Sequence, residues 1–162
     1  MKDRSLLYAI FGLSIAILPI ARHIALKLKP VDISFTATDG QQVNLAALRG
    51  KVVLIDFWAT WCGPCMREVP TVVSTYNTFH NRGFEVIGIS LDMDRSRLDS
   101  VTAQQRMPWP QYFDGKAWSN NIATQYGIHE IPTMWLIDKN GKLADANARE
   151  DLPDKVAKLL AQ

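Results

Sequence analysis

The chain has 162 residues, of which 48% are hydrophobic and 21% are charged, and its formal net charge at pH 7 is +2. This length fits one ordinary domain with an appendage, and the composition is that of a globular protein and argues against extensive disorder. The basic residues are scattered instead of gathered into a stripe, which argues against a nucleic-acid partner.

The first 29 residues are expected to form a targeting segment ahead of a single domain at residues 30–162. An apolar run at residues 6–21 follows a basic start and is itself followed by basic residues, as in a signal peptide or an uncleaved membrane anchor. No small-x-small pair follows the run, which argues against cleavage as a signal peptide. The run is also shorter than the roughly 20 residues of a bilayer-crossing helix, which argues against a simple membrane span. A buried or amphipathic helix is the alternative. We expect a signal-anchor at residues 5–28 that leaves the domain outside the cytoplasm, in the periplasm or cell envelope.

The domain is expected to begin with a β-hairpin. Residues 33–36 alternate in polarity, Asp39-Gly40 is a frequent turn dipeptide, and residues 42–44 can return as the second strand. Asn44 is suited to cap a brief turn that runs to Leu48.

A buried central strand and a helix are expected next. Residues 52–59 are almost uniformly apolar, which is typical of a strand covered on both faces. Asp56 is the exception, because a carboxyl group is rarely buried without a purpose. After Cys65, apolar residues recur at helical spacing as far as Phe79, so this helix should begin at the cysteines.

Helices and strands alternate in the second half of the chain. Residues 84–91 predict a second buried strand, and Ser96 is expected to cap a helix that runs towards Met107. A short helix should follow over residues 120–126 and end at Gly127.

A second hairpin and a last helix are expected to close the domain. Residues 133–137 and 142–144 flank a turn that ends in Asn140-Gly141, and the C-terminal helix has one apolar face. Strands that alternate with helices and end in a hairpin predict an α/β sandwich with a mixed central sheet.

Both cysteines of the chain lie in the motif Trp61-Cys62-Gly63-Pro64-Cys65. Two cysteines are too few to brace a fold of this size, so a C-x-x-C pair favours redox chemistry. A thiolate is the nucleophile in disulfide exchange, and the unpaired N–H groups at a helix start favour that anion at Cys62. Cys62 is therefore the expected attacking thiol, and Cys65 the thiol that resolves the mixed disulfide. An inert disulfide, or half of a metal site completed by histidine, is the alternative.

Two segments of the chain resemble the thioredoxins. Asp56-Phe-Trp-Ala-Thr-Trp-Cys-Gly-Pro-Cys65 resembles their active-site segment, residues 126–133 resemble the segment around their cis-proline, and Pro70 matches a helical proline. Three features look more like the TlpA/ResA-like branch, a group related to AhpC/TSA: the N-terminal hairpin, the sequence of residues 57–62 and the sequence of residues 137–142. Its members are exported, usually membrane-tethered thiol-disulfide oxidoreductases. The resemblance implies a thioredoxin-like three-layer sandwich with an N-terminal β-hairpin extension and a central insertion.

The resemblance also implies roles for individual residues. It gives the attacking role to Cys62 and the resolving role to Cys65, and it matches Pro132 to the cis-proline that faces the cysteines. A cis peptide bond at Pro132 would leave the backbone of Ile131 free to pair with an extended client segment. The expected substrate-binding residues are Trp61, Gly63, Pro64, Ile131 and Pro132.

Asp56 and Glu68 are the candidates for proton transfer and for tuning of the thiols. Asp56 matches the buried acid that thioredoxins place beneath the second cysteine, where burial raises a carboxyl pKa towards the range useful for proton exchange. Gly88 stands where thioredoxins offer a lysine partner for that acid. Glu68 matches an acidic position of the TlpA/ResA-like branch near the thiols. The alternatives are an Asp56 satisfied by a backbone hydrogen bond and a solvated Glu68.

The remaining tryptophans are interpreted as structural. Trp58 is expected to pack near Asp56, and Trp109, Trp118 and Trp135 are expected to be packing residues.

We interpret the chain as a thiol-disulfide oxidoreductase that reduces disulfides of client proteins outside the cytoplasm, either a general pool or one client such as an apocytochrome. The Gly63-Pro64 pair favours the reducing direction by resemblance. Electrons are expected from an upstream dithiol protein, and no cofactor is expected beyond Cys62 and Cys65, since the chain has no glycine-rich nucleotide motif. The alternatives are a disulfide oxidant or isomerase, a thiol peroxidase, and a non-enzymatic copper carrier that uses the cysteines and His129.

Overall fold

The structure is a computed structural model that describes residues 29–162. The signal-anchor expected at residues 5–28 lies outside this range, and so does almost all of the targeting segment. Within the described range, no helix combines the length and the apolar character that crossing a membrane requires.

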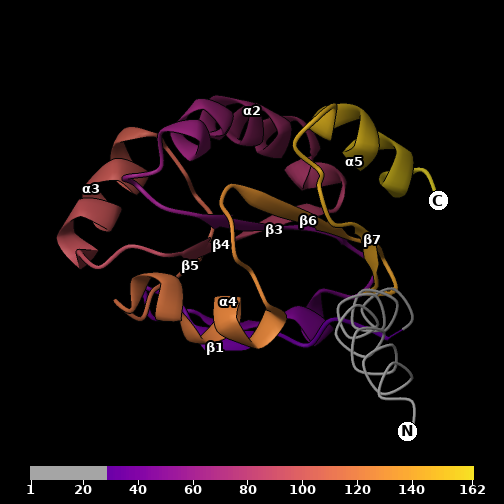
Figure 1. Ribbon diagram of the computed structural model, residues 1–162. Coiled ribbons are helices and arrows are strands. Elements are labelled where there is room, and N and C mark those ends of the chain that lie inside the picture. The colour runs from indigo at the N-terminus through magenta and orange to yellow at the C-terminus, as the bar shows by residue number, and fades with distance from the viewer. Residues whose placement is uncertain (1–28) are drawn as a thin grey trace, which may run out of the picture.

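Over the described residues, a five-stranded mixed sheet forms the centre of the domain, and a separate two-stranded hairpin precedes it (Figure 1). The hairpin consists of Ser34–Thr36 (β1) and Gln42–Asn44 (β2). The strands of the central sheet are Val52–Trp58 (β3), Phe84–Ser90 (β4), Gln111–Tyr112 (β5), Thr133–Ile137 (β6) and Leu143–Asp145 (β7). The α-helices are Gly63–Phe79 (α2), Arg95–Gln104 (α3), Asn121–Tyr126 (α4) and Leu152–Leu160 (α5). Short 3₁₀ helices lie at Leu45–Leu48 (η1), His80–Arg82 (η2) and Ala117–Ser119 (η3).

The strand order of the central sheet is β5-β4-β3-β6-β7, so β3 lies in the middle. β3 runs parallel to β4 and antiparallel to β6. Helices α2 and α5 lie along one face of the sheet, while α4 and the β1–β2 hairpin lie against the other (Figure 1). This arrangement confirms the predicted thioredoxin-like sandwich with a mixed sheet and an N-terminal hairpin.

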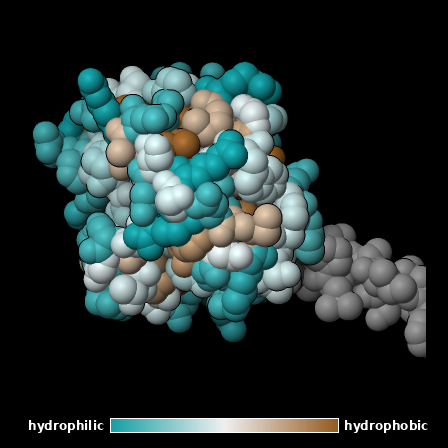
Figure 2. All heavy atoms as spheres, turned by 90° about the vertical axis from the view of Figure 1, so that its left-hand side faces the viewer, coloured by the Kyte–Doolittle hydropathy of each residue, from teal (hydrophilic) through white to brown (hydrophobic). Residues whose placement is uncertain are grey.

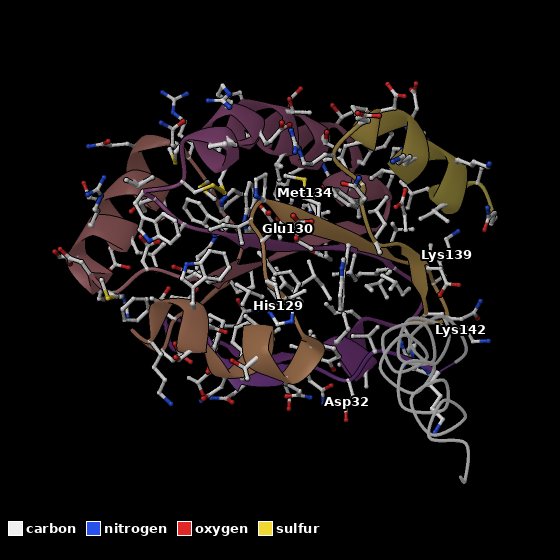
Figure 3. All side chains as sticks on the ribbon, viewed as in Figure 1. Asp32, His129, Glu130, Met134, Lys139 and Lys142 are labelled. Atoms are coloured by element: carbon white, nitrogen blue, oxygen red, sulfur yellow. A yellow bond between two sulfur atoms is a disulfide. The ribbon has the colours of Figure 1, made fainter. Side chains whose placement is uncertain are left out.

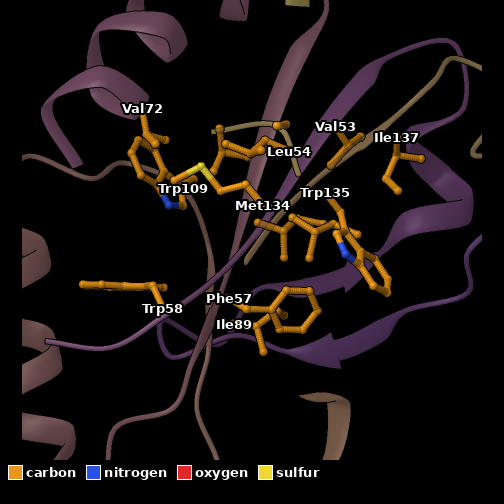
Figure 4. Close-up of a cluster of buried hydrophobic side chains, with 14 of the residues drawn as sticks. Val53, Leu54, Phe57, Trp58, Val72, Ile89, Trp109, Met134, Trp135 and Ile137 are labelled. Carbon is orange, nitrogen blue, oxygen red and sulfur yellow. The ribbon is translucent and has the colours of Figure 1, made fainter. Parts of the chain in front are cut away.

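The core is organised around β3, whose seven residues are all buried, as its apolar sequence predicts. Figure 4 shows Trp109 and Met134 on one side of the sheet, and Phe57 and Trp135 on the other. Phe57 and Trp135 pack edge to face with their ring centroids 5.4 Å apart, a favourable geometry for aromatic rings. β3 is therefore held from both faces, and the loop at its carboxyl end starts from a rigid strand.

Helix α3 begins and ends earlier than the sequence indicates. Asp94, and not Ser96, is the N-cap, because Asp94 Oδ1 accepts hydrogen bonds from the backbone N–H groups of Ser96 and Arg97. The helix ends at Gln104, and Arg106 then adopts a left-handed φ of 55°. This turn of the backbone ends the helical path before Met107.

The cap predicted at Asn44 and the helix end predicted at Gly127 are confirmed, and Asn120 is a further N-cap that was not predicted. Asn44 Oδ1 accepts a hydrogen bond from the N–H group of Ala46 at the start of η1. Asn120 Oδ1 does the same for the N–H group of Ala123 at the start of α4. Gly127 ends α4 with a left-handed φ of 66°, a conformation that glycine adopts without steric cost.

Candidate active site

Cys62 and Cys65 form a disulfide at the start of α2, with an S–S distance of 2.04 Å (Figure 3). Cys62 is the N-cap residue, and Pro64 lies in the first turn, where a missing N–H group costs no hydrogen bond. The backbone N–H group of Cys65 donates a hydrogen bond to Cys62 Sγ over 3.1 Å. In the dithiol form, the same N–H group and the positive end of the helix dipole would stabilise a thiolate at Cys62.

The Ile131–Pro132 peptide bond is cis, as predicted, and it lies against the disulfide. The carbonyl oxygen of Ile131 is 3.9 Å from Cys62 Sγ. A disulfide sulfur carries no hydrogen, so this is a contact and not a hydrogen bond. Figure 3 shows His129 and Glu130 on the same loop ahead of β6. The cysteine motif and the proline loop, which are far apart along the chain, thus meet at one end of the sheet, as the resemblance of both segments to the thioredoxins implies.

Asp56 is buried in the middle of β3 and is only 2% exposed. Burial is the main cause that raises the pKa of its carboxyl group from 3.8 to about 7, and the negative charge of Glu68 is the second. The atom Asp56 Oδ1 has no hydrogen-bond partner in the part of the chain that the structure describes, so the alternative in which a backbone hydrogen bond satisfies the carboxyl group does not hold for this oxygen. A carboxyl group that titrates near neutral pH can both accept and donate a proton.

Glu68 lies on α2, three residues after Cys65. Its Oε1 is 3.3 Å from Arg149 Nη2, and the two side chains are 23% and 43% exposed. A pair with this much solvent contact contributes little to stability. Glu68 nevertheless acts on Asp56 through its charge. It therefore combines features of both interpretations, since it is partly solvated and electrostatically coupled to the buried acid.

Asp92 organises the loop that leads to the cysteines, and it was not among the site residues expected from the sequence. Its carboxylate is 2% exposed and accepts hydrogen bonds from the N–H and Oγ1 groups of Thr60 and from Ser90 Oγ, at distances of 2.6 to 3.1 Å. A signal was available, because Asp92 follows the second buried strand. The carboxyl ends of parallel strands meet at one edge of the sheet, so Asp92 comes to lie beside Thr60.

Trp61 and Trp118 form an exposed aromatic pair next to the disulfide. They are 46% and 47% exposed, and their ring centroids are 6.1 Å apart. The interpretation of Trp118 as a packing residue is therefore wrong, because η3 carries it to the surface. Trp109 and Trp135 are buried, as predicted. Figure 2, which views the molecule from the left-hand side of Figure 1, shows hydrophobic side chains in small groups among hydrophilic ones.

Trp58 is 1% exposed, and its indole Nε1–H donates a hydrogen bond to Gln111 Oε1 over 3.0 Å. Trp58 and Asp56 are two residues apart on β3, so their side chains project to the same face of the sheet. Gln111 was not among the site residues expected from the sequence.

The alternative of a metal site finds no cluster of ligands in the described part of the chain. Among residues 29–162, no three His, Cys, Asp or Glu side chains lie together in an arrangement that could hold a metal ion. His80 lies 3.4 Å from the Glu85 carboxylate and stacks on Tyr76.

The fold and the site together define a thioredoxin-like protein, because a C-x-x-C pair at a helix start faces a cis-proline loop at one end of a mixed sheet. The profile of the AhpC/TSA family matches residues 26–146. The chain belongs to this family.

Named relatives and solved structures agree with this assignment. Thiol-disulfide oxidoreductase ResA from Bacillus thuringiensis (strain Al Hakam) is 32% identical over 114 residues, which cover 69% of this chain and 64% of that protein. ResA from Bacillus thuringiensis subsp. konkukian (strain 97-27) is 30% identical over 129 residues, which cover 78% and 73%. The thioredoxin domain of a thiol-disulfide oxidoreductase from Bacteroides vulgatus superposes with a TM-score of 0.72 and 30% identity, over 81% of this chain and 94% of that one. The chain thus spans a little less than two thirds of the first relative's length.

Proposed function

We propose that this chain is a thiol-disulfide oxidoreductase that reduces disulfides of client proteins outside the cytoplasm. The observation that carries the proposal is the position of Cys62, which caps α2 and lies 3.9 Å from the carbonyl oxygen of Ile131 in the cis-proline loop. The ResA relatives, which are named thiol-disulfide oxidoreductases, support the same reaction.

The proposed reaction begins with the dithiol form. The Cys62 thiolate attacks one sulfur of the client disulfide, an S–S bond forms between Cys62 and the client, and the second client sulfur leaves as a thiolate that takes up a proton. The Cys65 thiol then loses its proton and attacks Cys62 Sγ, which releases the first client sulfur as a thiol. Two electrons pass to the client, and the Cys62–Cys65 disulfide seen in this structure is the oxidised product.

Asp56 and Glu68 are assigned to proton transfer and its tuning. The Asp56 carboxylate accepts the proton that Cys65 gives up, since its pKa of about 7 suits proton exchange near neutral pH. The charge of Glu68 raises that pKa and makes Asp56 a stronger base.

The client binds as an extended segment across the cis-proline loop. The backbone of Ile131, which Pro132 turns towards Cys62, pairs with the segment as an added strand. Trp61 contributes exposed aromatic surface beside the disulfide. Gly63 and Pro64 form the edge of the first helical turn that the client approaches.

The cysteine pair is the redox group of the proposed reaction, with no bound cofactor. An upstream dithiol protein restores the dithiol form by the same exchange chemistry. An anchor at residues 5–28 holds the domain at the outer side of the cytoplasmic membrane, and the apolar run flanked by basic residues supports this location. Extracytoplasmic proteins with disulfides are the clients.

Reduction of insulin by the purified full chain, together with the redox potential of the Cys62–Cys65 pair, tests the proposal. We expect insulin reduction with dithiothreitol as electron source, and a potential near that of the reducing thioredoxins, about −270 mV. A potential above about −150 mV would instead indicate an oxidant or isomerase. Fast consumption of peroxide would indicate a peroxidase, and stoichiometric copper without insulin reduction would indicate a carrier.

A further inference from the structure

A buried glutamine flanks Asp56 on the same face of the central sheet. Asp56 on β3 pairs directly with Gly88 on β4, and Gly88 pairs directly with Gln111 on β5. Residues that pair directly in neighbouring strands project to the same face. Asp56 and Gln111 therefore stand on either side of Gly88, and they are only 2% and 4% exposed.

The Gln111 side chain occupies the space that a side chain at Gly88 would need. A Cβ atom at Gly88 would lie 2.0 Å from Gln111 Oε1 and 2.7 Å from Gln111 Nε2, which is closer than real Cβ contacts allow. Since β4 lies between β5 and β3, a side chain that starts on β5 and covers Gly88 extends towards β3. Glycine at position 88 thus lets Gln111 reach the strand that carries Asp56.

The hydrogen bond from Trp58 determines the orientation of the Gln111 amide. An indole N–H group can only donate, so the amide atom 3.0 Å from Trp58 Nε1 is the acceptor Oε1. The amide nitrogen Nε2 is left to find another acceptor, and it has no hydrogen-bond partner within residues 29–162. Asp56 Oδ1 has none either. A buried donor and a buried acceptor thus remain unpaired on one face, with the side-chain-free Gly88 between them.

We propose that Gln111 is a positioning residue that orients the Asp56 carboxyl group for proton exchange with Cys65, through one buried water that joins Gln111 Nε2 to Asp56 Oδ1. The inference rests on the proposed function for the step that it serves. Buried waters typically make two to four hydrogen bonds to polar groups that are otherwise unsatisfied. Trp109 Nε1 is a second buried donor without a partner among residues 29–162, and it belongs to the same face of the sheet (Figure 4). In this proposal, Trp109 Nε1–H donates a further hydrogen bond to the same water.

A hydrogen bond donated to Asp56 Oδ1 lowers the pKa of this carboxyl group. A donor to Oδ1 favours the charged carboxylate, whereas burial and the charge of Glu68 favour the protonated form. The groups that face Asp56 from the neighbouring strands, Gly88 on β4 and Met134 on β6, carry no charge. Helix α2 carries four ionisable side chains, Cys65, Arg67, Glu68 and Tyr76, of which Glu68 raises the pKa of Asp56 through its charge. Arg149 acts through its ion pair with Glu68. Loss of the Gln111 donor therefore raises the pKa of Asp56.

The positioning role belongs to the second half of the exchange. The Cys65 thiol transfers its proton to the Asp56 carboxylate, and the resulting thiolate attacks Cys62 Sγ and displaces the client thiol. A carboxylate held at Oδ1 by the water presents Oδ2 in one orientation for this proton. Gln111 itself touches neither the sulfur atoms nor the client in this scheme.

The variant Gln111→Met tests the inference, because methionine fills a similar volume and has no N–H donor. We expect the Asp56 carboxyl resonance, followed by carbon-13 NMR in the oxidised full chain, to titrate about one pH unit higher than in the parent. We also expect the resolving step to slow about tenfold below the new midpoint. Gln104→Met is the matched control, because it makes the same substitution at an exposed glutamine of α3; its Asp56 midpoint should not change. An unchanged midpoint in Gln111→Met overturns the inference.

A second measurement needs no substitution at Gln111. The side-chain N–H resonances of Gln111 in the parent chain should shift with the midpoint of Asp56, and this shift should vanish in Asp56→Asn. If the Gln111 side-chain N–H resonances do not change as Asp56 titrates, the inference is overturned, even if Gln111→Met does not fold. Insulin reduction separates the two proposals. If the parent chain reduces insulin but its Gln111 resonances do not follow the Asp56 titration, only the role of Gln111 is refuted. If the resonances follow the titration but the chain does not reduce insulin, only the proposed reductase function is refuted.

Discussion

The charge of Glu68 on α2 acts on the buried carboxyl group of Asp56 on β3. Burial is the larger cause and Glu68 the smaller one, and together they raise the pKa of Asp56 to about 7. Helix α2, which Cys62 caps and which contains Cys65, therefore also carries the charge that raises the pKa of Asp56. We therefore expect the stability of the domain and its proposed redox step to change with pH over the same range.

Substitution of Asp56 should stabilise the oxidised domain at neutral and alkaline pH. The folded-state pKa of about 7 lies above the ordinary value of 3.8, so between these values the folded protein binds more protons than the unfolded chain. Its free energy of unfolding therefore falls as pH rises through this window. Asp56→Asn removes this loss, and its advantage should grow from pH 4 to pH 8 to roughly 4 kcal/mol at most. Urea unfolding of both proteins at several pH values measures it.

The control for this experiment is Asp39→Asn, which neutralises an exposed carboxyl group in the β1–β2 turn. Its unfolding curves should follow those of the parent at every pH. If the difference between Asp56→Asn and the parent is independent of pH, the buried titration of Asp56 is refuted.

Glu68 and Arg149 should move the Asp56 midpoint in opposite directions. Glu68→Gln removes the negative charge that favours the protonated acid, so it should lower the pKa of Asp56 by less than burial raises it. Arg149→Gln removes the cation 3.3 Å from Glu68 and should raise that pKa. Carbon-13 titration of the Asp56 carboxyl group measures both. Shifts of the same sign would show that the coupling does not run through the Glu68 charge.

Loss of the Asp92 carboxylate should destabilise the domain and impair the loop before Cys62. Asp92→Ala leaves the buried N–H group of Thr60 and two hydroxyl groups without their acceptor. We expect a loss of roughly 3 kcal/mol in the free energy of unfolding and slower insulin reduction. Asp92→Asn keeps one acceptor oxygen and should lose less. An Asp92→Ala domain as stable as the parent would contradict this role.

Trp118 should contribute to binding of protein clients but not of small disulfides. It is 47% exposed and pairs with Trp61 at 6.1 Å beside the disulfide. Exposed aromatic side chains often contribute strongly to binding, so Trp118→Ala should lower kcat/KM for insulin about fivefold. The rate with oxidised glutathione, which is too small to span both rings, is the control and should stay within twofold of the parent. Equal losses for both substrates would show a general effect on the site.

Local sequence patterns were sufficient to predict the elements that hold the site. β3 is a continuous apolar run, and Gly127 ends α4 at the predicted position. Cys62 and Cys65 were found because both lie within one motif, and Pro132 because its surrounding segment is itself recognisable. Such features depend on residues that are close together along the chain, where periodicity and turn chemistry operate.

The contacts that the sequence did not reveal join residues far apart along the chain. Trp118 meets Trp61 only because η3 folds back to the start of α2. Gln111 reaches over Gly88 only because β5 adds to the edge of β4. β5 has two residues, which is too short to show an alternating pattern. These contacts depend on which strands become neighbours, and local periodicity carries no information on that choice.

The most direct test of the account asks which cysteine attacks. Full-length Cys65→Ser and Cys62→Ser are each reduced, mixed with insulin and analysed by mass spectrometry without reductant. In Cys65→Ser the resolving step is blocked, so a mixed disulfide between Cys62 and insulin should accumulate. Cys62→Ser should form less than about one tenth as much, because Cys62 lies at the helix start, where its thiolate is stabilised, whereas Cys65 lies within α2 and is the more buried of the two, at 2% exposure against 6%. Equal adducts on both variants, or none on Cys65→Ser, would contradict the assignment of Cys62 as the attacking thiol.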